Sequence, residues 1–305
     1  MQSPSAIRGA ADEASAKVLN NAGLGITMGA VFRFQGKEQK LRNSITYRHG
    51  EDLTTAQVRE IATENVWQWL SAGWRDLVNA PIQSLFYGVS LTLLSAAISL
   101  GVVINGSYYL LPLLLAGFAL LAPFLGIGPY SISRQLERGE DPNLKGAFLA
   151  CSRNTFHILN MGLVLLLFFL VWAMLANLIF IIFHQGLTPS SWQGFIAMLL
   201  GSWGGVQLLV VGTYIGGIIA LLVFAVSAIS IPMLLDRPVN VFEAIQTSLT
   251  AVRCNIAPML LWAVVLVSII SMGFLTLFVG LIVGFPLAAH ATWHAYRDLV
   301  AYHPG

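Results

Sequence analysis

Long uncharged, apolar tracts alternate along this chain with segments that hold its charged residues. No Asp, Glu, Lys or Arg occurs in residues 77–133, 154–235 or 254–296, which are runs of 57, 82 and 43 residues. A helix needs roughly 20 apolar residues to cross a bilayer, so each run has room for two spans and an uncharged turn. The pattern predicts an all-α fold, a polytopic membrane helix bundle of about six transmembrane helices.

Turn residues and changes in hydrophobicity mark the ends of the predicted spans. Asn105-Gly106-Ser107 is a turn signal after the first span. Residues 192–203 are apolar but too short to cross, so we interpret them as an interfacial or re-entrant helix. If they did cross, the chain would have seven spans and its C-terminus would lie outside. The predicted spans are residues 82–104, 110–133, 156–183, 206–235 and two within 256–296.

Six spans place all the charged loops on one side of the membrane. Residues 134–153 contain four basic residues, residues 236–253 contain two, and Arg297 follows the last span. The loops of the other side contain no charge, so the positive-inside rule predicts that both termini lie in the cytoplasm. The residues predicted at the cytoplasmic boundary are Arg75, Arg153, Asp236, Arg237 and Arg253.

This topology divides the chain into three predicted parts. Residues 1–50 mix charged residues with glycine and serine, and we expect a flexible cytosolic N-terminal tail. Residues 51–79 are expected to form a cytosolic amphipathic helical segment. Residues 80–305 are expected to form the six-span transmembrane domain.

A threefold internal pattern is superimposed on the spans. Residues 66–78, 143–154 and 239–255 each place apolar residues at helical spacing and each precede an outward-going span. Each contains an Arg followed closely by an Asn: Arg75 and Asn79, Arg153 and Asn154, Arg253 and Asn255. A repeated unit of surface helix, span out and span back would explain the pattern. The alternative is that any amphipathic helix on a membrane surface has this composition.

Composition excludes two other classes of protein. Hydrophobic residues make up 56% of the chain and charged residues only 10%, whereas a soluble domain carries about 25% charged residues. The net charge of +2 gives no reason to expect nucleic-acid binding. The bilayer is therefore the first expected partner, with a membrane-protein partner or a second copy of the chain as a further one.

Candidate sites of chemistry are few. His290 and His294 are four residues apart, so they share one helix face and could hold haem or a metal. Both also lie near a predicted membrane boundary, where His and aromatic residues gather without binding anything, and no cofactor is predicted. No predicted span contains a charged residue, which argues against a proton pump. Asn160, Asn177 and Gln207 could line a polar cavity or could only join helices by hydrogen bonds.

Several motifs along the chain together resemble one family. They are Gly73-Trp74-Arg75-Asp76-Leu77, Ser84-Leu85-Phe86-Tyr87-Gly88, Ser133-Arg134-Gln135-Leu136-Glu137-Arg138-Gly139, Ser230-Ile231-Pro232-Met233-Leu234-Leu235-Asp236-Arg237 and His290-Ala291-Thr292-Trp293-His294-Ala295-Tyr296-Arg297. They resemble a bacterial family of uncharacterised multi-pass inner-membrane proteins, a domain of unknown function sometimes labelled cytochrome c oxidase subunit I-like. The spans are too few and the histidines too peripheral to support that label. Residues 231–255 also resemble, more remotely, the membrane domain of some glycerophosphodiester phosphodiesterases.

Three hypotheses for function follow. The first is a non-enzymatic inner-membrane scaffold whose cytoplasmic helices contact lipid or a partner. The second is a transporter of a small solute or lipid, which needs a cavity lined by residues such as Asn160, Asn177 and Gln207. The third is a haem or metal protein of the respiratory chain that uses His290 and His294.

Overall fold

The computed structural model describes residues 57–152, 154–184, 189 and 191–301. The predicted N-terminal tail and Arg153 lie outside the described residues. Apart from one isolated bridge between Val58 and Val300, the regular structure of the described part is helical. The predicted all-α membrane bundle is confirmed.

Five segments are long and apolar enough to cross a membrane. Two of them change direction slightly within their length, α5 into α6 at Gly126 and α10 into α11 at Ala228 and Ile229. The outer surfaces of the five segments carry many exposed Leu, Ile, Val and Phe side chains, which suits contact with lipid. The segments are α4 (Pro81–Ile104), α5 (Leu110–Leu125) with α6 (Ile127–Glu137), α8 (Thr155–Phe183), α10 (Trp203–Ser227) with α11 (Ser230–Asp236), and α13 (Ile256–Leu275).

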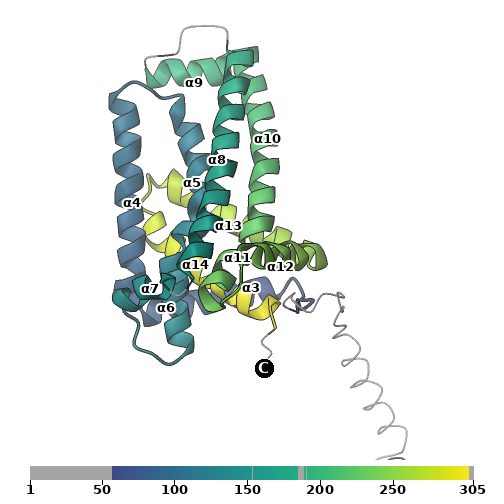
Figure 1. Cartoon of the computed structure of the whole chain (residues 1–305). Helices are drawn as coiled ribbons and strands as arrows, with labels where there is room; N and C mark the ends of the chain where they lie inside the picture. The colour runs from purple at the N-terminus through teal and green to yellow at the C-terminus, as the bar shows by residue number, and fades with distance from the viewer. Residues whose placement is uncertain (1–56, 153, 185–188, 190, 302–305) are drawn as a thin grey trace, which may run out of the picture. The chain divides into compact units, whose positions relative to one another are not determined.

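Three surface helices lie near one end of the bundle (Figure 1). They are α3 (Asn65–Asn79), α7 (Leu144–Cys151) and α12 (Val241–Cys254), and each precedes an outward-going helix. We call this the charged end, because α6 and α11 also finish here with Glu137 and Asp236. The opposite, neutral end carries the turn at Asn105 and the short helix α9 (Trp192–Gly201).

The junction between surface helix and bundle helix has the same backbone form three times. Ala80 (φ −131°, ψ 58°), Asn154 (φ −140°, ψ 35°) and Asn255 (φ −128°, ψ 48°) each break the helix for one residue. The shared conformation supports the predicted threefold repeat. In the first unit, however, the break falls on Ala80 and not on the expected Asn79.

The short apolar segment forms a helix of its own that is too short to cross, which fits its interpretation as an interfacial or re-entrant helix. α9 has only 10 residues, and it lies across the neutral end, roughly perpendicular to α8 and α10 (Figure 1). The hydroxyls of Ser191 and Ser202 accept hydrogen bonds from the backbone N–H groups of Gly194 and Gly205. These two caps satisfy the first turns of α9 and α10, so the chain can bend sharply between them.

The predicted sixth span differs from the other five. α14 (Leu281–Leu299) is not among the helices long and apolar enough to cross, and most of its residues are buried against protein. Gly73 of α3 and Gly88 of α4 let it approach closely, because a Cβ there would lie 2.5 Å from Ala291 N and 2.0 Å from the carbonyl oxygen of Ile282. α14 is therefore the central helix of the charged end, and its sequence is less apolar than those of the five long segments because protein surrounds it.

The turn between α13 and α14 lies about halfway along the bundle. The hydroxyl of Thr92, in the middle of α4, donates to the carbonyl of Phe278 in this turn (3.1 Å), and Figure 1 shows the turn beside α5 below the level of α9. Of its exposed residues, Leu277 and Val279 are apolar, and the hydroxyl of Thr276 donates to the carbonyls of Met272 and Gly273. Every backbone N–H from residue 277 to 282 has an acceptor inside the turn, so the turn can lie in hydrocarbon. α13 and α14 thus form a hairpin that enters from the charged end and returns to it.

Candidate functional site

A network of buried charges joins α6, α11 and α14 at the charged end. Asp236, at the end of α11, accepts a hydrogen bond from the hydroxyl of Tyr296 (2.9 Å). Its carboxylate also lies 3.3 Å from Arg134, 3.3 Å from Arg297 and 3.8 Å from Arg138. The side chains of Arg134 and Asp236 are only 8% and 12% exposed. This pair is therefore a buried one rather than a solvated loop pair.

Glu137 holds the same network from α6. It pairs with Arg297 at 2.8 Å, and its other oxygen accepts a hydrogen bond from the indole of Trp293 (3.1 Å). On the far side, Arg237 Nε donates to the hydroxyl of Tyr296 (3.0 Å). Burial raises the pKa of Tyr296, and the neighbouring Asp236 acts in the same direction, so this hydroxyl stays protonated and remains a donor.

His290 lies at the centre of the charged end and is fully buried. Its Nδ1 is 2.7 Å from the hydroxyl of Ser133 in α6, and its Nε2 is 2.9 Å from the hydroxyl of Ser84 in α4. Burial lowers the pKa of His290 to about 4, although the carboxylate of Asp76 acts the other way, so the ring is neutral at physiological pH. A neutral imidazole donates through one nitrogen and accepts through the other, so one ring satisfies both serines.

His294 is placed one turn further along the same face, as predicted, but serves another contact. Its Nε2 is 2.8 Å from Asp76 of α3. One turn beyond it, Asp298 accepts hydrogen bonds from Asn65 (2.8 Å) and from the indole of Trp69 (3.0 Å). The two histidines therefore share a helix face but fasten different neighbours, and both nitrogens of His290 are already engaged. Among the described residues, no group of three or more His, Cys, Asp or Glu could hold a metal ion.

The cations of the surface helices differ from those of the network. Arg75 on α3, Lys145 on α7 and Arg253 on α12 are exposed, and no carboxylate of the described residues forms an ion pair with them. Large exposed apolar side chains lie on or beside the same helices: Trp67, Trp74, Leu149, Phe242 and Ile256. Of the predicted boundary residues, Arg75 and Arg253 are thus free at the surface, whereas Asp236 and Arg237 belong to the network.

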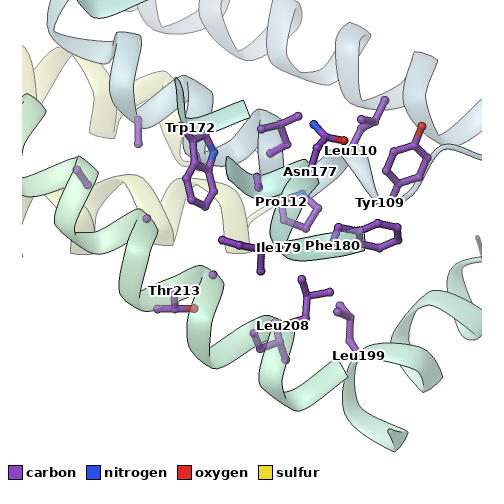
Figure 2. A pocket seen from close by; sticks show the side chains of 18 of the residues that line it. Tyr109, Leu110, Pro112, Trp172, Asn177, Ile179, Phe180, Leu199, Leu208 and Thr213 are labelled. Carbon is purple, nitrogen blue, oxygen red and sulfur yellow. The ribbon is translucent and has the colours of Figure 1, made fainter. Parts of the chain in front are cut away.

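Two apolar cavities lie between the bundle helices. The first, of about 380 Å³, lies between α5, α8, α9 and α10 and is partly open to the surface of the bundle. Figure 2 shows Trp172 at one end of it and Tyr109 and Phe180 at the other. The second, of about 320 Å³, lies between α5, α10, α13 and α14. Ala119, Leu120 and Ala220 line both cavities, so the two adjoin.

The three polar residues predicted to share a cavity do not come together. Asn177 lines the first cavity, but its amide donates to the carbonyl of Ala173 on the preceding turn (2.7 Å). Asn160 and Gln207 are partly buried and line neither cavity. Sequence analysis missed Ser84 and Ser133, the partners of His290, because one more serine in an apolar span carries no signal of its own.

A family model matches part of the chain. The family model described as "Predicted integral membrane protein (DUF2189)" matches residues 110–236, which run from the start of α5 to the end of α11. No curated protein and no solved structure matches the chain. Together with the five apolar segments, the match shows an integral membrane protein with several membrane helices, and the resemblance to an uncharacterised membrane family is confirmed over this range. The remote resemblance to a phosphodiesterase membrane domain stays a prediction.

Proposed function

We propose that this protein is a non-enzymatic scaffold of the bacterial inner membrane, with its charged end and both termini in the cytoplasm. In this proposal the surface helices α3, α7 and α12 lie among anionic lipid headgroups and fix the position of the bundle. The observation that carries it is the repeated pairing of a free cation with an exposed apolar side chain on these helices. Basic side chains near an anionic surface contribute about 1 kcal/mol each.

The charge network supports a structural role rather than a catalytic one. Its carboxylates and its buried cations are directed at each other, at Tyr296, at Trp293 or at the backbone. A catalytic acid or base would instead need a cavity in which substrate could reach it. Both cavities of the bundle are lined mostly by apolar side chains and contain none of these charged residues.

Lipid retention tests the proposal. The triple variant Arg75→Gln, Lys145→Gln, Arg253→Gln removes one free cation from each unit, and Gln68→Ala with Gln246→Ala changes two uncharged exposed residues of α3 and α12 as a matched control. Native mass spectrometry of protein released from membranes should show several-fold less bound phosphatidylglycerol and cardiolipin on the triple variant only. Equal amounts on all three proteins would contradict the proposal.

The transporter hypothesis has one observation in its favour, namely the adjoining cavities. These are mostly apolar, however, and of Asn160, Asn177 and Gln207 it is Asn177 that lines one of them. The respiratory-chain hypothesis has less support, because both ring nitrogens of His290 form hydrogen bonds with serines and His294 contacts Asp76. An absorption spectrum of the purified protein tests it directly, since haem bound by these residues would give a visible Soret band.

A further inference from the structure

The three units of the bundle pack against each other in a repeated way, with one exception. Each unit consists of a surface helix, an outgoing helix and a returning segment, and the outgoing helix lies against the returning segment of the unit before it. α8 packs against α5 in this way, and α4 packs against α14, which joins the first unit to the last. The third pair is α13 and α10. In the described part of the chain these two helices hardly touch, and the second cavity, of about 320 Å³, lies between them.

This open interface faces lipid. Leu221 of α10 and Val267 of α13 both line the cavity, and both are also exposed on the outer surface of the bundle. The cavity is therefore a cleft that an acyl chain can enter from the side. Comparison with the two closed interfaces indicates that the cleft is a departure from the repeat rather than a general feature of loose packing.

The wall of the cleft is polar mainly toward the charged end. Thr292 is at the level of α3, because its neighbour Ala291 packs against that helix. Ser227 is at the level of α12, because Ile229, just beyond it, donates its N–H to the hydroxyl of Ser248. Amphipathic surface helices lie at the boundary between headgroups and acyl chains, where the ester groups of glycerolipids are found. The residues with hydroxyl groups that line the cleft are Tyr130, Ser227, Thr292 and, near the turn of the last hairpin, Ser271.

Tyr130 presents a free hydrogen-bond donor to the cleft. It belongs to α6, one turn before Ser133, and only 3% of the residue is exposed. Its hydroxyl forms no hydrogen bond with any residue that the structure describes. The oxygen is nevertheless accessible, unlike the indole nitrogens of Trp172 and Trp262, which are buried completely. Since Tyr130 lines the second cavity and not the first, the hydroxyl opens on the cleft.

A buried donor without an acceptor costs about 1–3 kcal/mol, so this hydroxyl points to an acceptor inside the cleft. Ser227 and Thr292 do not supply one, because their hydroxyls bond to the carbonyls of the preceding turns of their own helices. A glycerolipid of the leaflet at the charged end matches the cleft in direction. Its ester carbonyls lie near the headgroups, and its chains run toward the apolar middle of the bilayer.

We infer that the cleft between α10 and α13 binds one glycerolipid, with an ester carbonyl accepting the hydrogen bond of Tyr130. An acyl chain of this lipid takes the place of the helix contact that closes the other two interfaces. The site differs from the contacts of α3, α7 and α12 with anionic headgroups, because it selects for the ester and the chain and not for the charge of the headgroup.

Binding of two lipids that differ only at the ester tests the inference. Purified, delipidated protein in detergent is titrated with dioleoyl phosphatidylethanolamine or with its diether analogue, and bound lipid is measured by native mass spectrometry. The zwitterionic headgroup keeps the anionic-lipid contacts out of the measurement. Tyr130→Phe removes the donor, and Tyr214→Phe, at a residue 71% exposed on α10, is its matched control.

A second pair of variants fills the cleft without removing a polar group. Gly217 lines the cleft, and no atom lies within 4 Å of a Cβ placed there, so Gly217→Leu occupies the space without a clash. Gly101→Leu on α4 is the control, since Gly101 also has no atom within 4 Å of such a Cβ and lines neither cavity.

We expect the diester lipid to bind the wild type, Tyr214→Phe and Gly101→Leu equally. It should bind Tyr130→Phe about threefold to tenfold more weakly, as for one neutral hydrogen bond, and Gly217→Leu not measurably. The diether lipid should bind the wild type as weakly as the diester binds Tyr130→Phe, and Tyr130→Phe should not weaken it further.

Equal binding of the two lipids to the wild type would overturn the inference, as would diester binding that Gly217→Leu leaves unchanged. Loss of the diester lipid from the triple variant Arg75→Gln, Lys145→Gln, Arg253→Gln, with no loss from Tyr130→Phe, would assign the bound lipid to the surface helices instead. A dimer of the wild type that Gly217→Leu dissociates would show that a second copy of the chain occupies the cleft, and would also overturn the inference.

Discussion

At the charged end, individual side chains connect segments that are far apart in the chain. Asp236 touches residues from α6 and α14, and His290 touches one serine from α4 and one from α6. Buried polar groups of this kind are costly when they lose a partner, because the remaining group stays desolvated. Stability should therefore be much more sensitive at these residues than at the exposed charges a few positions away.

Replacing Asp236 with Asn tests this sensitivity. The change leaves Arg134 buried without its counter-charge and removes an acceptor from Tyr296. We expect a loss of about 3 kcal/mol in the free energy of unfolding, seen as a lower midpoint of thermal unfolding in detergent. The control is Asp141→Asn on the exposed loop, where a change within about 0.5 kcal/mol is expected. Equal midpoints for the two variants would contradict a structural role for the network.

The neutral state of His290 predicts a specific dependence of stability on pH. Because its folded pKa is about 4, against about 6.5 in the unfolded chain, the unfolded chain binds the proton first as the pH falls. The contribution of neutral His290 to the free energy of unfolding should thus be complete above pH 6.5. It should fall by about 3 kcal/mol as the pH is lowered from 6.5 to 4. Thermal unfolding of His290→Asn at both pH values should show a smaller difference than the wild type. The same pH dependence in both proteins would assign the effect to other groups.

The sequence predicted the spacing of His290 and His294 on one helix but not the residues that they contact. A spacing of four residues from His290 to His294 implies one helix face, and both lie on α14. Ser84 and Ser133 lie 206 and 157 residues away from His290 in the chain, and serines occur throughout the spans, so nothing local marks these two as its partners.

Helices at the charged end pack by close approach of backbones. Gly73 and Gly88 both face α14, whereas Gly101 has no atom within 4 Å of the position of a Cβ. Two pairs of glycines four residues apart, Gly201 with Gly205 and Gly212 with Gly216, divide in the same way. Gly205 lies against the backbone of α9 and Gly216 lies against Trp172, but Gly201 and Gly212 face open space. A glycine pattern in a span therefore does not tell which glycine carries a contact.

Alanine substitution separates the two kinds of glycine. Gly88→Ala would place a Cβ 2.0 Å from the carbonyl oxygen of Ile282, so α4 and α14 must move apart, and we expect a loss of about 1–3 kcal/mol in stability. Gly101→Ala has free space and a better helix propensity, so it should be neutral or stabilising by up to about 1 kcal/mol. Thermal unfolding of the two variants side by side measures the difference. If both are destabilised alike, α14 does not lie against α4 as described.

For the molecule as a whole, the apolar composition predicted the class of fold better than the number of crossings. The spans, the surface helices and α9 were found where the sequence placed them. The hairpin of α13 and α14 was interpreted as two full spans, because its turn, Thr276-Leu277-Phe278-Val279-Gly280, is as apolar as a span interior. Hydropathy shows which residues are compatible with hydrocarbon, but it does not show how deep in the bundle a turn lies. The depth of this turn follows from contacts such as the hydrogen bond from Thr92 to Phe278.

Cysteine labelling in intact cells measures this depth. In a background with Cys151→Ser and Cys254→Ser, Leu277→Cys should resist a water-soluble maleimide from both sides of the membrane, because its exposed side chain faces hydrocarbon. Ser107→Cys, in the turn at the neutral end, should react from outside and serves as the control. Labelling of Leu277→Cys as fast as Ser107→Cys would show instead that α13 and α14 cross completely.

The same background tests the proposed orientation. Glu140→Cys and Gln246→Cys lie on exposed positions of two different charged segments. Both should be protected in intact cells and should react once the inner membrane is opened, since both segments are placed in the cytoplasm. Opposite behaviour of the two would contradict a common side for the charged segments.

A hairpin that turns inside the bilayer also bears on how the protein is assembled. The Asn105 turn must be carried across the whole membrane with its polar groups, as must the segment that joins α8 to α9. In the turn at Leu277, the polar side chain that must enter the membrane interior is Thr276. The backbone N–H groups of this turn already donate hydrogen bonds within the hairpin. We therefore expect the last unit to insert from the charged end after the first two units, once α3, α4 and α6, against which α14 packs, are in place.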